Sequence, residues 1–177
     1  MSSKTFRIIV LAALALALFG ACKGEKAAES DPFSFVVYPN SRYLGQLTDM
    51  TKAAHKIIDP NGVVPATAAY DTEAPVEEVA RFYANEYGYE LAPEPPVTLT
   101  NKPKAYFRNG DLNADTKGIE ELLKKLNLGT DVSKAVGTYR AAEIEAKANR
   151  PRVTVQRPYF DVTKSEVVDR TYILMSR

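Results

Sequence analysis

The chain has 177 residues, of which 45% are hydrophobic and 25% are charged, and its formal net charge is +1. This balance is typical of globular proteins and excludes disordered, collagen-like and multi-pass membrane proteins. Cys22 is the single cysteine, so an internal disulfide is impossible.

The N-terminus predicts an export signal. Lys4 and Arg7 form a positive segment, and residues 8–19 follow without a charged or strongly polar side chain. About 20 apolar residues are needed to cross a bilayer as a helix, so this run is typical of a signal peptide rather than of a permanent span.

The segment Leu18-Phe19-Gly20-Ala21-Cys22 resembles the lipobox of bacterial lipoproteins, in which small residues precede a cysteine that is lipidated. The resemblance implies that residues 1–21 are removed and that acyl chains on Cys22 hold the protein in a membrane. Each buried methylene contributes about 0.8 kcal/mol, so two or three chains anchor a protein stably. Lys23 stands where an aspartate often retains such proteins in the inner membrane, which favours the outer membrane.

Two other fates of the signal remain open. An ordinary signal peptidase that cleaves after Ala21 would leave a soluble exported protein with a free thiol. An uncleaved signal would leave a membrane anchor.

The rest of the chain divides into a short tether and one domain. Residues 22–32 contain the lipidated cysteine and a polar run without large apolar side chains, and ten such residues span about 16 to 19 Å as a flexible coil. Residues 33–177 show no internal repeat or linker and are expected to form one globular domain.

Charge is unevenly distributed in this domain. Residues 33–100 carry four basic and nine acidic side chains, whereas residues 101–177 carry fifteen and ten. The simplest interpretation is that the two halves pair with each other. A basic half could also attract an anionic lipid or glycan.

The first elements are read from strand formers and helical spacing. Residues 33–38 predict a strand that residues 39–41 end as a turn. Apolar residues at helical spacing from Leu47 to Ile58 predict an amphipathic helix, with Thr48 or Asp49 as its N-cap. Residues 64–70 alternate weakly and predict a second strand.

The strongest predicted element is a helix that begins near Pro75 and ends at Gly88. Acidic residues in its first turn suit the helix dipole. Its buried stripe is expected to consist of Val76, Val79, Ala80, Tyr83 and Tyr87.

Four prolines predict a surface loop over residues 91–103. Residues 104–108 predict a strand, and residues 109–111 predict a turn. Residues 119–126 predict a helix with an apolar stripe. Residues 138–147, 153–156 and 170–176 predict three strands, with a turn at 163–165 before the last. The sum is an α+β domain, an antiparallel sheet with two or three helices packed on one face.

The domain also resembles small uncharacterised bacterial lipoproteins. The resemblance rests on Tyr38-Pro39, on Tyr70-Asp71-Thr72 and on the helix Val76-Glu-Glu-Val-Ala-Arg-Phe-Tyr-Ala-Asn-Glu-Tyr-Gly88, within residues 36–89. It implies the fold and the compartment, and it brings no catalytic residues.

The sequence lacks the residues that most catalytic mechanisms need. His55 is the single histidine, no Gly-x-Ser-x-Gly segment is present, and a zinc site would need carboxylates for nearly every ligand. We therefore expect no catalytic residue, metal or cofactor. Glycan cleavage stays open as an alternative, because it needs only two carboxyl groups about 5 to 10 Å apart, one with a raised pKa.

The best binding candidates are the basic residues Arg150, Arg152 and Arg157 with Tyr159, because arginines beside aromatics hold anionic glycans, phosphate groups or protein partners. The competing interpretation is an ordinary solvent-facing or ion-paired strand. We expect a lipid-anchored, non-enzymatic envelope protein that binds an unknown envelope protein or anionic glycan and no nucleic acid. The alternatives are a glycan hydrolase or a soluble exported ligand-binding module.

Overall fold

The computed structural model describes residues 35–95, 103–116 and 118–177. The predicted signal, Cys22 and the tether lie outside the described residues. The elements in chain order are β1 (Arg42–Tyr43), α1 (Gly45–Ile58), β2 (Thr67–Thr72), α2 (Val76–Tyr87), β3 (Leu91–Ala92), β4 (Ala105–Asp111), α3 (Leu112–Thr116), α4 (Glu120–Lys125), a 3₁₀ turn (Val132–Lys134), β5 (Thr138–Ile144), β6 (Arg152–Arg157), β7 (Tyr159–Asp161), β8 (Glu166–Val168) and β9 (Thr171–Ser176).

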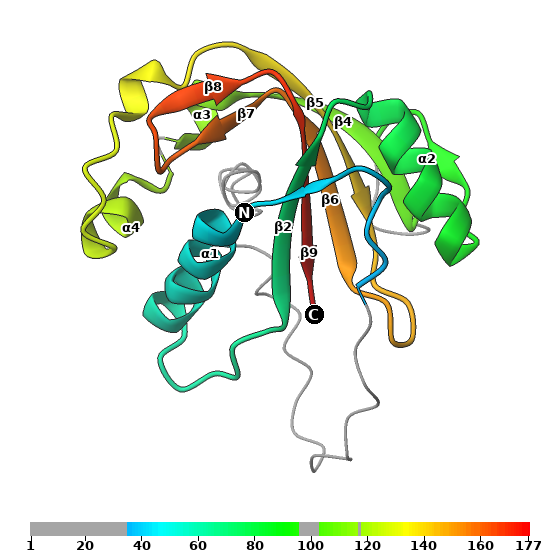
Figure 1. The fold of residues 1–177 in the computed structure, drawn as a ribbon, viewed down its shortest axis with the longest axis horizontal. Coiled ribbons are helices and arrows are strands. Elements are labelled where there is room, and N and C mark those ends of the chain that lie inside the picture. The colour runs from blue at the N-terminus through cyan, green and yellow to red at the C-terminus, as the bar shows by residue number, and fades with distance from the viewer. Residues whose placement is uncertain (1–34, 96–102, 117) are drawn as a thin grey trace, which may run out of the picture.

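Seven strands form one sheet in the order β1-β2-β9-β6-β5-β4-β3, and β7 and β8 form a separate hairpin (Figure 1). All neighbouring strands of the sheet are antiparallel except β3 and β4, which are parallel. The predicted α+β plan with a mostly antiparallel sheet is therefore confirmed.

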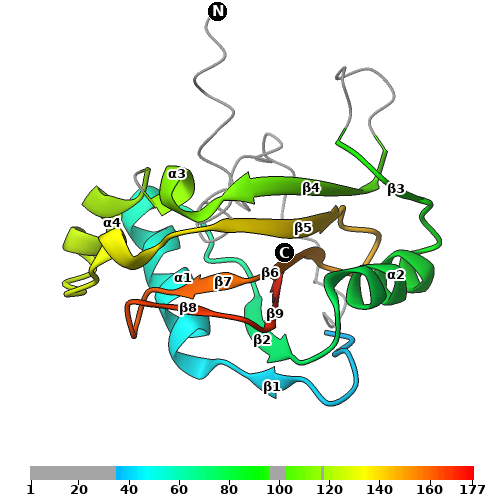
Figure 2. The same cartoon turned by 90° about the horizontal axis from the view of Figure 1, so that it is seen from above.

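The helices lie on both faces of the sheet, so the prediction that they pack on one face is not confirmed. Side chains of α2 pack with Ile173 and Met175 of β9, whereas Leu47 and Met50 of α1 share a cluster with Tyr172 and Leu174. Successive residues of a strand point to opposite faces. We call these the α2 face and the α1 face, and Figures 1 and 2 show the two helices on opposite sides of the central strands.

Helix α2 confirms its prediction closely. Pro75 is the N-cap in extended conformation, and the predicted stripe is buried. Gly88 ends the helix with a φ of 64°, in the left-handed region where glycine carries no steric penalty.

Helix α1 confirms the prediction of a helix but not of its cap. It begins at Gly45 after Leu44, without a side-chain cap. The predicted cap Thr48 is buried, and its Oγ1 accepts a hydrogen bond of 2.9 Å from the backbone N–H of Ala69. The hydroxyl thus satisfies a backbone N–H at the edge of β2 that the short β1 does not reach.

Two predictions near strands are wrong. Residues 35–38 are not a strand, because the N–H of Tyr38 donates to the hydroxyl of Tyr83 on α2 at 3.1 Å. Residues 109–111 are not a turn, because β4 continues through them in pairing with β5. A Cβ atom on Gly110 would lie 2.0 Å from the Tyr139 hydroxyl, so this glycine is needed for a close approach.

The region between these elements differs in detail from the prediction. Leu91 and Ala92 of the predicted loop form β3, and residues 96–102 lie outside the described residues. The helix predicted at 119–126 is the six-residue α4, and the short α3 precedes it.

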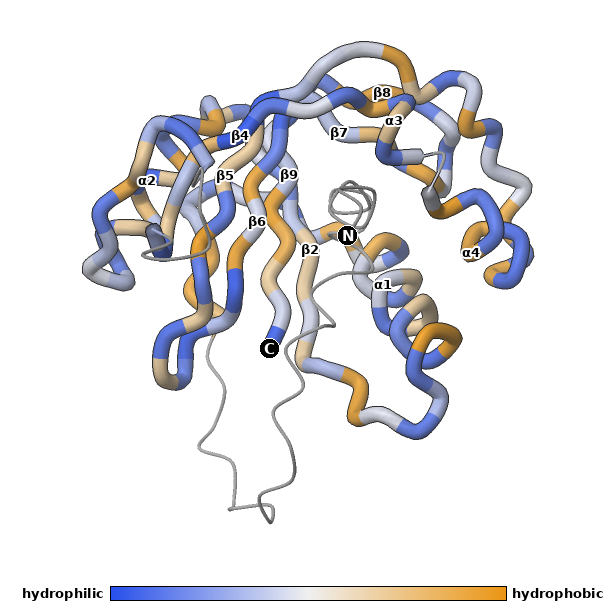
Figure 3. Tube along the Cα trace, turned by 180° about the vertical axis from the view of Figure 1, so that it is seen from behind, coloured by the Kyte–Doolittle hydropathy of each residue, from blue (hydrophilic) through white to orange (hydrophobic). Residues whose placement is uncertain are grey.

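The C-terminal strands are confirmed as β5, β6 and β9, with the predicted turn between β7 and β8. Every residue of β9 is buried, because both of its faces carry a packed cluster. Figure 3 shows apolar colours along the central strands β6 and β9. No helix within the described ranges is long and apolar enough to cross a membrane.

Candidate functional site

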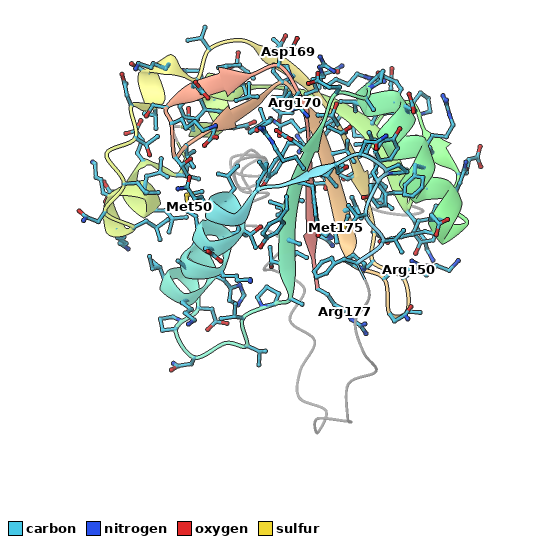
Figure 4. All side chains as sticks on the ribbon, in the orientation of Figure 1. Met50, Arg150, Asp169, Arg170, Met175 and Arg177 are labelled. Carbon is cyan, nitrogen blue, oxygen red and sulfur yellow. The ribbon has the colours of Figure 1, made fainter. Side chains whose placement is uncertain are left out.

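The predicted binding residues do not form one patch. Arg150 precedes β6 and Arg157 ends it, so about 23 Å of extended chain separates them. In Figure 4, Arg150 lies at the lower end of the sheet, and Asp169, the partner of Arg157, lies at the top. Tyr159 is buried on the α1 side, in contact with Tyr172 at 5.1 Å between ring centroids.

Two of the three arginines have acidic partners. Arg150 lies 3.5 Å from Glu86 of α2, and the Arg157 Nε donates to Asp169 at 2.8 Å. Arg152 is exposed and has no charged partner among the described residues. Binding through these side chains stays a prediction, and Arg152 is the member whose charge is free to meet a ligand.

Ion pairs also join the acidic and basic parts of the chain. Arg140 pairs with Glu77 at 2.9 Å, and Arg170 lies 3.1 Å from Asp71. These contacts, like the one between Arg150 and Glu86, connect residues 101–177 with residues 33–100. They support the interpretation that the two halves satisfy each other.

The structure instead aligns polar side chains in a row on the α1 face. The row follows the register across six neighbouring strands, from β4 to β1, about 24 Å in all. In spatial order its members are Arg108, Gln156, Tyr172, Asp71 and Arg42, and the apolar Ala141 of β5 lies between Arg108 and Gln156. We call this set the polar row.

Asp71 is the charged centre of one end of the row. Its side chain is fully buried, and it accepts hydrogen bonds from Arg42 at 2.6 and 3.1 Å and from the Tyr159 hydroxyl at 3.1 Å. Arg170 also pairs with Glu73. The hydrogen bond to Asp71 raises the pKa of Arg42, and burial, then Asp71, raises the pKa of Tyr159.

Arg108 is the charged centre of the other end. It donates to Glu143 at 2.8 and 3.1 Å and to the Tyr139 hydroxyl at 2.7 Å, while Thr154 donates to the second oxygen of Glu143 at 2.8 Å. Burial lowers the pKa of Arg108, but Glu143 and Tyr139 more than reverse this effect. The guanidinium therefore stays charged.

Asp115 of α3 is a buried acid near this end. Its Oδ2 has no hydrogen-bond partner. Burial raises its pKa, Tyr139 and Arg108 oppose this, and Asp111 adds to it. Asp111 caps α3 by accepting a hydrogen bond of 3.0 Å from the N–H of Ala114.

Tyr172 and His55 also carry buried polar atoms without a hydrogen-bond partner. The Tyr172 hydroxyl lies in the polar row between the register positions of Gln156 and Asp71, and burial, then Asp161, raises its pKa. Both ring nitrogens of His55 on α1 are also unpartnered. Each of these groups keeps free hydrogen-bonding capacity, although an unsatisfied buried group costs stability.

The polar row combines hydrogen-bonding groups with a charged network at each end. Within residues 35–95, 103–116 and 118–177, no group of three or more His, Cys, Asp or Glu side chains could hold a metal ion. Comparison of the chain with protein-family models, with curated proteins and with solved structures found no match.

Proposed function

We propose that the protein is an exported lipoprotein, anchored through acyl chains on Cys22, whose domain binds a partner in the cell envelope without catalysis. The proposal rests on one observation. The single cysteine of the chain follows a charged segment, an apolar run too short to span a membrane comfortably, and two small residues.

The domain is compatible with this role. The described fold begins at Phe35, thirteen positions after Cys22. The buried carboxylates of Asp71 and Asp161 and the half-buried carboxylate of Glu143 have arginine or lysine partners, so they stabilise the fold rather than serve as free acids. The outer membrane is the proposed location, because Lys23 follows the cysteine.

Mass spectrometry of the mature protein tests the anchor. The expected N-terminal peptide begins at Cys22 and carries the mass of acyl chains, and the protein is extracted from membranes by detergent alone. Cys22→Ser is expected to abolish incorporation of labelled palmitate. An unmodified sulfur, or equal labelling of Cys22→Ser, would refute the proposal.

A carboxylate-based glycan hydrolase is the second candidate, and Asp115 favours it. A buried carboxyl with a raised pKa, beside a second carboxyl on Asp111, has the character of a general acid. Release of chromophore from chromogenic glycosides, lost in Asp115→Asn, would support this candidate. No turnover by the wild-type protein on a panel of such glycosides would eliminate it.

A further inference from the structure

Partly exposed aromatic side chains lie in the first described segment and on β1, β2 and α2. Two ring pairs form this surface: Tyr38 with Phe82, edge to face at 5.2 Å, and Tyr43 with Tyr70, tilted at 5.4 Å. We call the surface the aromatic shelf, which consists of Phe35, Val37, Tyr38, Tyr43, Tyr70 and Phe82.

The shelf is a fixed part of the domain. Phe35, Tyr38, Tyr70 and Phe82 pack against the rim of the cluster under α2. The ring of Tyr43 lies over Gly45, since a Cβ atom there would meet its edge at 3.4 Å. Rings held in place lose little freedom when they meet a partner.

The outward side of the shelf is aromatic and apolar, and charged side chains of both signs lie at its α2 edge. Tyr43 is 54% exposed and Val37 is 38% exposed. Arg81 is exposed next to Phe82 on α2, and the exposed Glu78 accepts a hydrogen bond from the Tyr38 hydroxyl. Tyrosine is favoured at the membrane–water interface, and arginine attracts anionic headgroups.

The chain outside the described residues indicates what lies next to this surface. Twelve residues, 23–34, separate Cys22 from Phe35. Even a fully extended chain of this length reaches only about 45 Å, so an anchor on Cys22 keeps the start of the domain near the bilayer. A short link of this kind gives the domain an effective concentration at the membrane surface in the millimolar range, at which even a weak contact with the bilayer is occupied.

We infer that the aromatic shelf rests on the surface of the bilayer that carries the anchor, with its tyrosine rings at the level of the headgroups. This inference rests on the proposed anchoring through Cys22. It fixes the orientation of the domain: α2 and β1 face the membrane, and the loop after α1 points away from it.

Tryptophan fluorescence tests the orientation, because the chain contains no tryptophan. Tyr43→Trp and Val37→Trp each place one indole on the shelf. Val63→Trp is the matched control, since Val63 is the most exposed large hydrophobic residue of the described ranges, at 90%, and lies in the loop after α1. Each lipidated variant is reconstituted into vesicles with and without brominated acyl chains, and circular dichroism checks that it is folded.

For Trp at positions 43 and 37, the expected result is a blue shift of the emission and its quenching by brominated lipid. For Trp at position 63, neither effect is expected. Quenching of position 63 alone, of all three positions equally, or of none would overturn the inference. The mass of the protein in the same vesicles reports lipidation separately. If it is absent, the sole thiol of Cys22 is coupled to a maleimide lipid and the measurement is repeated, so failure of the anchor and failure of the contact are distinguished.

Discussion

Removing the charge of Asp71 is expected to destabilise the domain far more than removing its most exposed partner. Asp71→Asn keeps the shape of the side chain but leaves Arg170, whose side chain is 25% exposed, without its buried counter-ion. Breaking a buried ion pair costs about 3 to 5 kcal/mol. Water reaches both arginines here, so we expect about 2 to 3 kcal/mol, which lowers the Tm of a domain of this size by about 5 to 10 °C.

Arg42→Ala is the matched control. Its side chain is 60% exposed, and exposed ion pairs contribute about 0 to 1 kcal/mol. Urea denaturation followed by circular dichroism measures the free energy of unfolding of both variants from midpoint and slope. Equal losses for the two variants, or a loss below about 1 kcal/mol for Asp71→Asn, would refute the assignment of Asp71 as the centre of the network.

Three further outcomes are expected. Gly110→Ala should cost about 1 to 3 kcal/mol in urea denaturation, because the added Cβ displaces the Tyr139 hydroxyl; a neutral result would show that the approach is not tight. Gly88→Ala should cost about 1 kcal/mol, because alanine is strained at a φ of 64°, and an unchanged midpoint would contradict this. Burial raises the pKa of Asp115, so its contribution to stability is lost as pH rises above the ordinary value of 3.8. The free energy of unfolding of the wild type should therefore fall relative to that of Asp115→Asn as pH rises, and a difference that does not change with pH would contradict this.

Elements with a strong local signal could be predicted from the sequence. Helix α2 carries its own start, stop and apolar stripe, and β6 and β9 are rich in strand formers. Elements that depend on distant partners could not. Residues 35–38 lie along α2 because the N–H of Tyr38 donates to the hydroxyl of Tyr83, 45 positions away. The turn signal at 109–111 is overridden by the pairing of β4 with β5.

The candidate site was less accessible to sequence reasoning than the fold. The members of the polar row come from five strands, and their alignment depends on a strand order that differs from the chain order. The signal that could have indicated them is a charge inside a run of strand formers, as for Asp71 after Tyr70 and Arg108 after Phe107. Tyr159 is buried rather than exposed because it contacts Tyr172.

The strand β9 is last in chain order but stands in the middle of the sheet, between β2 and β6. Thr67 and Ser176, whose hydroxyls lie 3.5 Å apart, are separated by 109 residues. The sheet therefore stays in two unjoined parts until residues 171–176 have been synthesised. A premature stop codon just before Thr171 would leave both parts unable to join.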